Sequence, residues 1–147
     1  STIYQGTYGG KYCNITDNII TNSGWNGIRG NVSSDLSYSN IEGNIINNSG
    51  ILAGVSNAQE WIYLNTTTKT KIGFNEILNS ERHGMQLQNV TYARVIGNLV
   101  TLSGQSGIVE SGNADFNIYS LNDLLNNPVT NLSTVGANNE YGHNFTS

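Results

Sequence analysis

Two acidic and two basic residues have side chains suited to acid–base chemistry: Glu60, Arg82, His83 and Glu110. Two carboxyl groups held roughly 5 to 10 Å apart are what hydrolysis of a glycosidic bond requires. An imidazole near either carboxyl group can transfer protons. We take these four residues as the candidate catalytic set. The competing interpretation, which we prefer, is that they are solvated charges in loops on an otherwise neutral surface.

Three large aromatic residues suggest a different kind of site. Trp25, Trp61 and Tyr63 could form a platform on which sugar rings stack through their apolar C–H faces. Nearby polar side chains could bind sugar hydroxyls. The candidate carbohydrate-binding set is Trp25, Arg29, Trp61, Tyr63, Gln86 and Gln88. The alternative is that one or both tryptophans pack inward or against an inserted loop.

The elements that must position these side chains follow from an internal repeat. An asparagine followed by an apolar pair recurs at steps of 26, 31, 23 and 24 residues, with one acidic residue intervening in the third and fifth repeats. Self-similarity at this period predicts a solenoid, in which each repeat buries its apolar face by stacking on its neighbours. The repeated asparagines are Asn18, Asn44, Asn75, Asn98 and Asn122.

The apolar stretches are too short and too β-branched for helices, and clusters of Asn, Ser and Gly separate them. This pattern predicts an all-β parallel β-helix of about five to six coils. In one coil we expect strands at 92–96, 99–102 and from 107 onward. The second coil carries an insertion at 51–60, followed by its third strand at 61–64. Alternation along that strand points Ile62 and Leu64 inward and Trp61 and Tyr63 outward.

The same alignment places the candidate catalytic residues around the third strand of each coil. Arg82 and His83 lie in the loop before the strand of the third coil, Glu60 before that of the second, and Glu110 within that of the fourth. Stacked coils are about 4.8 Å apart. These groups could therefore lie within one or two coils of one another.

We interpret the repeated asparagines as structural. Asparagine tolerates positive φ at a tight corner, and stacked amides can form a hydrogen-bonded ladder. Asn138 is a candidate sixth return of the repeat. We expect one domain, with coils over 1–138 and a C-terminal tail over 139–147. Because neither end shows a capping unit, we expect either a segment of a longer solenoid or a homo-oligomer.

Charge argues against several function classes. The net charge is −4 with six Lys and Arg residues, and Lys69, Lys71, Arg82 and Arg94 are scattered along the sequence. Nucleic-acid binding needs a clustered basic surface, so we expect none. No apolar run approaches the ~20 residues of a membrane span. Two histidines and one cysteine argue against a zinc site, and we expect no metal and no cofactor.

The phrases at 18–24, Asn-Ile-Ile-Thr-Asn-Ser-Gly, and at 80–85, Ser-Glu-Arg-His-Gly-Met, resemble the right-handed parallel β-helix repeat. The resemblance is to the broad pectate-lyase-like superfamily of polysaccharide lyases, polygalacturonases, alginate epimerases, phage tailspikes and adhesins, and it covers roughly 3–138. The resemblance is specific for the fold but not for an activity, because the repeats encode the coils whereas function depends on individual side chains. The catalytic motifs of that superfamily are absent, because the four aspartates are dispersed and no calcium-binding group of carboxylates stands out.

These observations predict an extracellular, cell-surface or virion-surface segment that binds a polysaccharide or cell-surface glycan along an exposed sheet face. One alternative is a carbohydrate-active enzyme, either a polysaccharide lyase or a glycoside hydrolase. The other is a purely structural segment of an adhesin, a filament or a trimeric spike.

Overall fold

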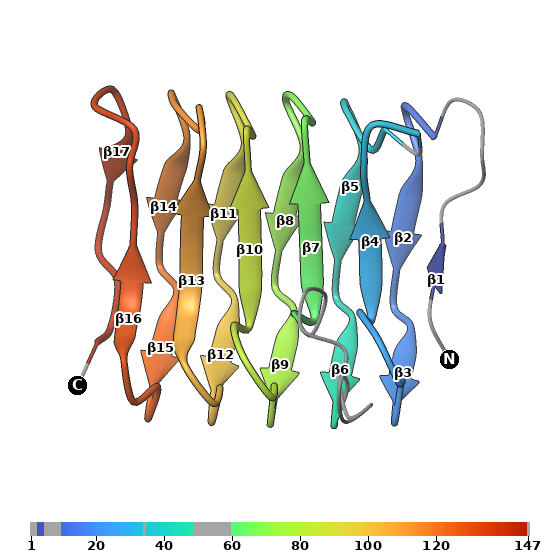
Figure 1. Ribbon diagram of the computed structural model, residues 1–147, viewed down its shortest axis with the longest axis vertical. Helices are drawn as coiled ribbons and strands as arrows, with labels where there is room; N and C mark the ends of the chain where they lie inside the picture. The colour runs from blue at the N-terminus through green and yellow to red at the C-terminus, as the bar shows by residue number, and fades with distance from the viewer. Residues whose placement is uncertain (1–2, 5–9, 34, 49–59, 147) are drawn as a thin grey trace.

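The computed structural model describes residues 3–4, 10–33, 35–48 and 60–146. These residues form a parallel β-solenoid of about five turns, and none of them is in a helix (Figure 1). Accordingly, the described part of the chain contains no helix that could cross a membrane. The predicted fold class is confirmed, whereas the handedness of the coil stays a prediction.

Each turn contributes one short strand to each of three parallel sheets. Sheet A contains β1 (Ile3–Tyr4), β4 (Ile28–Gly30), β7 (Ile62–Asn65), β10 (Met85–Gln88), β13 (Ser106–Ser111) and β16 (Thr130–Ser133). Sheet B contains β2 (Asn14–Thr16), β5 (Asn40–Glu42), β8 (Lys71–Gly73), β11 (Arg94–Ile96), β14 (Ile118–Ser120) and β17 (Glu140–Tyr141). Sheet C contains β3 (Ile19–Thr21), β6 (Ile45–Asn47), β9 (Glu76–Leu78), β12 (Leu99–Thr101) and β15 (Asp123–Leu125).

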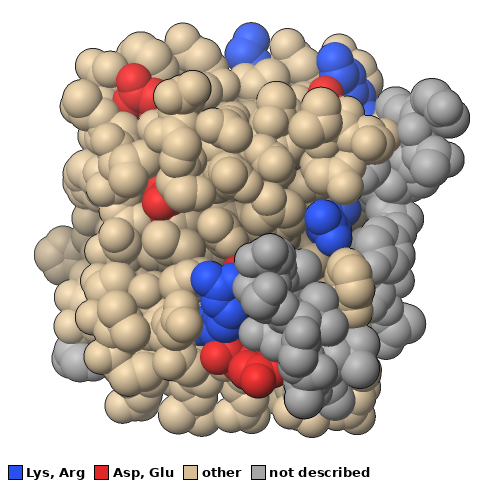
Figure 2. Space-filling model, in the orientation of Figure 1, with Lys and Arg blue, Asp and Glu red and all other residues tan. Residues whose placement is uncertain are grey.

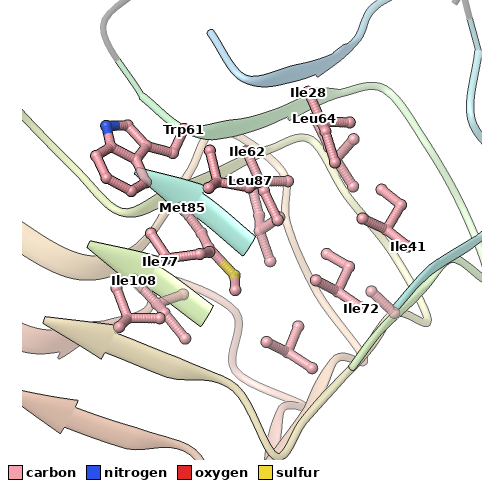
Figure 3. Close-up of a cluster of buried hydrophobic side chains, with 14 of the residues drawn as sticks. Ile28, Ile41, Trp61, Ile62, Leu64, Ile72, Ile77, Met85, Leu87 and Ile108 are labelled. Atoms are coloured by element: carbon pink, nitrogen blue, oxygen red, sulfur yellow. The ribbon is translucent and has the colours of Figure 1, made fainter. Parts of the chain in front are cut away.

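The sequence repeat sets the register between turns. Ile41 of β5 pairs with Ile72 of β8, which pairs with Val95 of β11. Because side chains alternate along a strand, such a column of β-branched residues faces the interior at every turn. Figure 3 shows Ile, Leu and Met side chains from several strands pointing into this shared core. The core is therefore continuous along the stack.

The predicted asparagine ladder is confirmed. The Asn98 amide Nδ2 donates to the Ile72 carbonyl at 3.0 Å and to the Asn122 Oδ1 at 2.9 Å. Its own Oδ1 accepts from the backbone N–H and the Nδ2 of Asn75 at 3.1 and 2.9 Å. Asn44, two turns before Asn98, repeats this pattern. Each buried amide is thus satisfied by the turns on either side of it.

The predicted backbone reason for these asparagines is wrong. The positive φ angles belong to the residues immediately before them, as at Gly43 (φ 66°), Phe74 (φ 53°) and Gly97 (φ 69°). The corner is therefore made by the preceding residue. The asparagine itself supplies the amide that hydrogen bonds between turns.

The repeat also continues past residue 138, into the segment expected to be a tail. Glu140–Tyr141 forms β17 and pairs with β14, and Asp123 bridges to Phe145. Asn144 is the sixth member of the ladder, because its Oδ1 accepts from the N–H and Nδ2 of Asn122. Asn138, the expected sixth member, instead donates to the Asp115 carboxylate.

The strand positions expected for one coil match β11, β12 and β13 closely. The third strand of the second coil begins at Ile62, one residue later than expected. Most of the predicted insertion, residues 51–59, lies outside the described residues.

Candidate functional site

Two of the four candidate catalytic residues, which precede β7 and β10 of sheet A, form an ion pair. Arg82 Nη1 lies 3.0 Å from Glu60 Oε1, and the Glu60 side chain is fully buried. Removing one partner of a buried ion pair leaves the other charge uncompensated, which is strongly destabilising. In this pair Glu60 serves as the partner that neutralises Arg82.

His83 lies beside this pair and is itself half-buried. Its Nδ1 accepts a hydrogen bond from the backbone N–H of Ser106 at 3.3 Å. Burial, and secondarily the charge of Arg82, lower the pKa of His83 to about 4. The imidazole is therefore neutral at pH 7 and carries no proton to donate from Nδ1.

The fourth residue, Glu110, lies inside the solenoid. Its carboxylate accepts five hydrogen bonds, which come from the backbone N–H groups of Val135 and Gly136 and from the side chains of Asn117, Tyr119 and Asn139. It pairs in register with the core residue Leu87. Glu110 lies within the third strand of the fourth coil, as expected, but its side chain is buried, so the expectation that it shares a patch on the third-strand face with His83 is wrong.

The outer face of sheet A carries part of the predicted aromatic platform. Arg29 lies 5.4 Å from the centre of the Tyr63 ring, and the Tyr63 hydroxyl donates to Gln88 Oε1 at 2.6 Å. Gln86 Nε2 donates to Ser111 Oγ at 3.4 Å on the same face. Most of this face is uncharged (Figure 2). These contacts confirm that Tyr63 points outward.

The two tryptophans of the predicted platform differ in burial. Trp61 has no exposed surface, so the outward orientation expected for it is wrong. The expectation failed because β7 begins at Ile62, so the alternation of inward and outward side chains along the strand does not extend to Trp61. Trp25 is half-buried. The exposed part of the predicted platform thus loses Trp61, whereas Trp25, like Tyr63, is partly exposed.

A second surface, which the sequence analysis did not identify, runs along the corner that leads into sheet B. One residue from each of five successive turns lies at this corner, and the third of them is a lysine between two pairs of aromatic residues. We call this set the aromatic column, and it consists of Tyr12, Tyr38, Lys69, Tyr92 and Phe116. Its rings are between 42% and 74% exposed. Every member has positive φ, between 55° and 61°. This backbone geometry turns each side chain outward at the same point of its turn.

The rings of the aromatic column stack in two pairs. The centroids of Tyr12 and Tyr38 are 5.2 Å apart, and those of Tyr92 and Phe116 are 5.0 Å apart with an 8° angle between planes. Lys69 interrupts the stack, and its Nζ lies 5.4 Å from the centre of the Tyr38 ring. Tyr92 thus stacks on a ring on one side only, within the described residues.

A hollow of about 330 Å³ lies beside this interruption. Three of its residues are cationic and the others are mainly apolar; we call it the basic pocket. It is lined by Lys69, Thr70, Lys71, Tyr92, Arg94, Phe116 and Ile118. The expectation that the basic residues are scattered is therefore wrong for Lys69, Lys71 and Arg94, because the repeat brings them together.

Positive charge exceeds negative charge in the basic pocket. Lys71 Nζ lies 2.7 Å from Glu42 Oε1 on the neighbouring strand. On its other side Lys71 pairs in register with Arg94. Arg94 forms no ion pair or hydrogen bond with another side chain in the described part of the chain. Among the three cations of the pocket, Lys71 alone forms an ion pair within the described residues.

A signal for the aromatic column was present in the sequence. Tyr12, Tyr38, Lys69, Tyr92 and Phe116 are separated by 26, 31, 23 and 24 residues, which are the steps of the asparagine ladder. Each column residue stands six positions before a ladder asparagine. Tracking the other positions of the repeat, as well as the asparagine, would have found the column.

Comparisons with protein-family models, with curated proteins and with solved structures found no match to this chain.

Proposed function

We propose that this chain binds polysaccharide along the outer surface of the solenoid, through the aromatic column and the basic pocket beside it. The observation that carries the proposal is the row of exposed rings at one corner of successive turns. Sugar rings stack on aromatic side chains through their apolar C–H faces. Within each stacked pair one face of each ring is covered by the other ring. The other face of Tyr92 borders the basic pocket, where a sugar ring could lie against it.

The shape and lining of the basic pocket support the same proposal. Small-molecule sites are typically hollows of roughly 300 to 1,000 Å³ with a few polar groups among apolar ones. The pocket, at about 330 Å³, is at the lower end of that range. Tyr92, Phe116 and Ile118 supply the apolar part, and the cations supply hydrogen-bond donors for sugar oxygens. This composition suits a single sugar unit of a longer chain.

A purely structural role is the second candidate, and the ring stacking itself favours it. Offset or parallel aromatic pairs contribute about 0.5 to 1.5 kcal/mol beyond their burial. The Tyr12–Tyr38 and Tyr92–Phe116 pairs each join neighbouring turns. Under this hypothesis the chain is a segment of an adhesin, a filament or a trimeric spike, and the rings stabilise the stack.

The enzyme alternative has weaker support. Glu110 is enclosed by its five donors, and Glu60 is committed to Arg82. A lyase or hydrolase would need the carboxylates and His83 to meet at one substrate. We therefore keep lyase or hydrolase activity as an alternative for the experiment to decide.

Following the resemblance, we further propose a right-handed coil of the pectate-lyase-like type that acts at a cell or virion surface. Self-association of the solenoid, or its continuation in a longer chain, is part of the same proposal.

A binding panel with two matched variants tests the function. Purified chain is run through gels containing neutral and acidic polysaccharides, and retardation and new chain ends are both measured. Tyr92→Asn removes a ring from the column, and asparagine tolerates the positive φ at that position. Phe74→Asn is the control, because Phe74 is 65% exposed, has φ 53° and does not line the pocket.

We expect retardation that Tyr92→Asn abolishes and Phe74→Asn leaves unchanged. Equal effects of the two variants on retardation would overturn the column as the binding surface. No retardation by any polysaccharide, together with a lower melting temperature for Tyr92→Asn, would favour the structural role. New chain ends would establish an enzyme.

A further inference from the structure

We infer that the basic pocket binds a small planar aromatic acid, with the ring of the ligand at one end of the pocket and its carboxylate at the other. The inference goes beyond glycan binding, because the ligand is a free small molecule and its binding needs no sugar chain. It follows from the order in which the lining residues succeed one another along the solenoid.

The lining residues come from three successive turns and change from cationic to apolar along the stack. The first of these turns supplies two lysines, the second a tyrosine and an arginine, and the third a phenylalanine and an isoleucine. In that order they are Lys69, Lys71, Tyr92, Arg94, Phe116 and Ile118. The pocket therefore has a cationic end and an apolar end, which lie two turns or roughly 10 Å apart.

The aromatic rings of the pocket present a flat surface. Tyr92 and Phe116 stack with their centroids 5.0 Å apart and an angle of 8° between their planes. The turn before Tyr92 carries Lys69 in place of a ring, so among the described residues no ring covers the other face of Tyr92. Aromatic rings favour offset stacking at such separations. A flat ring placed in the pocket would extend the existing stack by one member.

The cationic end of the pocket brings like charges together. Lys71 and Arg94 are register partners on adjacent strands, and like charges in such positions repel. Glu42 pairs with Lys71 at 2.7 Å, and Lys69 lies over the Tyr38 ring. Arg94 has no such side-chain partner within the described residues. A carboxylate bound there would relieve the repulsion and accept two parallel hydrogen bonds from the guanidinium.

The backbone beneath the pocket is held in place by hydrogen bonds between turns. The Lys69 N–H donates to the Thr91 carbonyl at 2.9 Å, and the Tyr92 N–H donates to the Asp115 carbonyl at 3.2 Å. Small-molecule sites are usually formed before the ligand arrives. The pocket meets this condition, because its corner is fixed by the same contacts that hold the stack together.

Two other kinds of acid fit the pocket less well. A sugar acid carries hydroxyl groups around its ring and would place some of them against Phe116 and Ile118, which offer them no hydrogen-bond partner in their side chains. A fatty acid matches the polarity of both ends, but its flexible chain loses conformational freedom on binding and cannot stack on Tyr92. A rigid, flat acid avoids both costs.

Three ligands with one carbon skeleton test the inference. The first is 2-naphthoate, the second is its uncharged amide, and the third is decahydro-2-naphthoate, which keeps the carboxylate but has saturated, puckered rings. Binding of each to the purified chain is measured by calorimetry. The amide reports the contribution of charge, and the saturated acid reports the contribution of ring stacking.

Two variants separate the two ends of the pocket. Arg94→Gln removes the cation that has no ion-pair partner in the described chain. Phe116→Asn removes a ring at a position where φ is 56°, which asparagine tolerates. Lys11→Gln and Phe74→Asn are the matched controls, because they remove the same kinds of group outside the pocket.

We expect 2-naphthoate to bind about fivefold more tightly than its amide and about threefold to tenfold more tightly than the saturated acid. Arg94→Gln should remove most of the first preference, and Phe116→Asn most of the second. Both controls should keep both preferences. Equal binding of the flat and saturated acids would overturn the requirement for an aromatic ligand. Equal binding of the acid and its amide would overturn the recognition of a carboxylate.

Failure of this inference can be distinguished from failure of the proposed function. Absence of 2-naphthoate binding, together with polysaccharide retardation that Tyr92→Asn abolishes, would overturn the inference and leave glycan binding intact. Binding of 2-naphthoate with the expected preferences, but without retardation by any polysaccharide, would support the inference and count against the proposed function.

Discussion

The phenol of Tyr119 donates a hydrogen bond to the carboxylate of Glu110, and both side chains lie inside the solenoid. Burial, and secondarily the charge of Glu110, raise the pKa of Tyr119 far above its usual range. The pair belongs to a polar group that joins β13 and β14 to the last turn, through Val135, Gly136 and Asn139. Glu110 therefore holds the end of the stack together.

Replacing this carboxylate should destabilise the fold without changing any surface. Glu110→Gln puts an NH₂ group where the carboxylate now accepts from five donors. A buried donor left without a partner costs about 1 to 3 kcal/mol, and more when a charge is involved. We expect the free energy of unfolding in urea to fall by about 2 to 4 kcal/mol. Glu140→Gln, at an exposed position, is the control. Equal stability of the two variants would contradict this role.

The asparagine ladder gives a second test of stability. Asn98→Ala removes four hydrogen bonds and leaves the Ile72 carbonyl and the Asn75 N–H buried without those partners. We expect a loss of about 3 kcal/mol in unfolding free energy. Asn40→Ala removes one exposed amide contact, to Asn14 at 3.0 Å, and should cost under about 0.5 kcal/mol. Similar midpoints in urea for the two variants would show that the buried ladder contributes little.

The pKa of His83 predicts a dependence of stability on pH. Its pKa falls from 6.5 to about 4 on folding, because burial and Arg82 disfavour the charged imidazole. The folded state therefore binds its proton less readily than the unfolded state. The contribution of His83 to stability is complete above pH 6.5 and is lost as the pH falls toward 4.

Two measurements check this dependence. Titration of His83 by NMR should give a midpoint near 4. The urea midpoint of His83→Asn, whose amide oxygen can still accept from Ser106, should fall less between pH 6.5 and 4 than that of the unmodified chain. Parallel curves for the two proteins would mean that other groups set the pH dependence.

Trp61 should behave as a core residue in mutagenesis. Trp61→Ala leaves a cavity where a fully buried indole stood, and we expect a loss of about 3 to 5 kcal/mol. Tyr63→Ala, on the outer face of β7, should cost about 1 kcal/mol or less. A Trp61→Ala variant that keeps full stability but loses glycan binding would restore the original platform hypothesis.

The architecture was predictable because one position of the repeat is chemically constrained at every turn. An amide side chain both donates to and accepts from the turns beside it, as Asn98 does. Asparagine therefore recurs at this position of every turn and reveals the period. The orientation of Trp61 was not predictable in this way, since it precedes the strand whose alternation was applied to it. Glu110 is different: it stands two residues after the core residue Ile108, so the same alternation already points it inward.

The basic pocket was missed because linear distance was used to judge clustering. Lys71 and Arg94 are far apart in the sequence, yet they occupy the same position of successive turns and become register partners. In a solenoid, residues one period apart are neighbours. Charge patterns in such a chain have to be compared at the repeat period rather than along the sequence.

The unequal lengths of the turns have a consequence for how this scaffold can change. The step from Asn44 to Asn75 is 31 residues, against 26 for the step before it, yet the amide contacts remain near 2.9 Å in both. The extra residues lie between Asn47, where β6 ends, and Ile62, where β7 begins. The number of residues between β6 and β7 is thus uncoupled from the register of the strands on either side. The position between β6 and β7 is accordingly the natural place to insert a foreign peptide for display, because the strand pairing on either side can stay as it is.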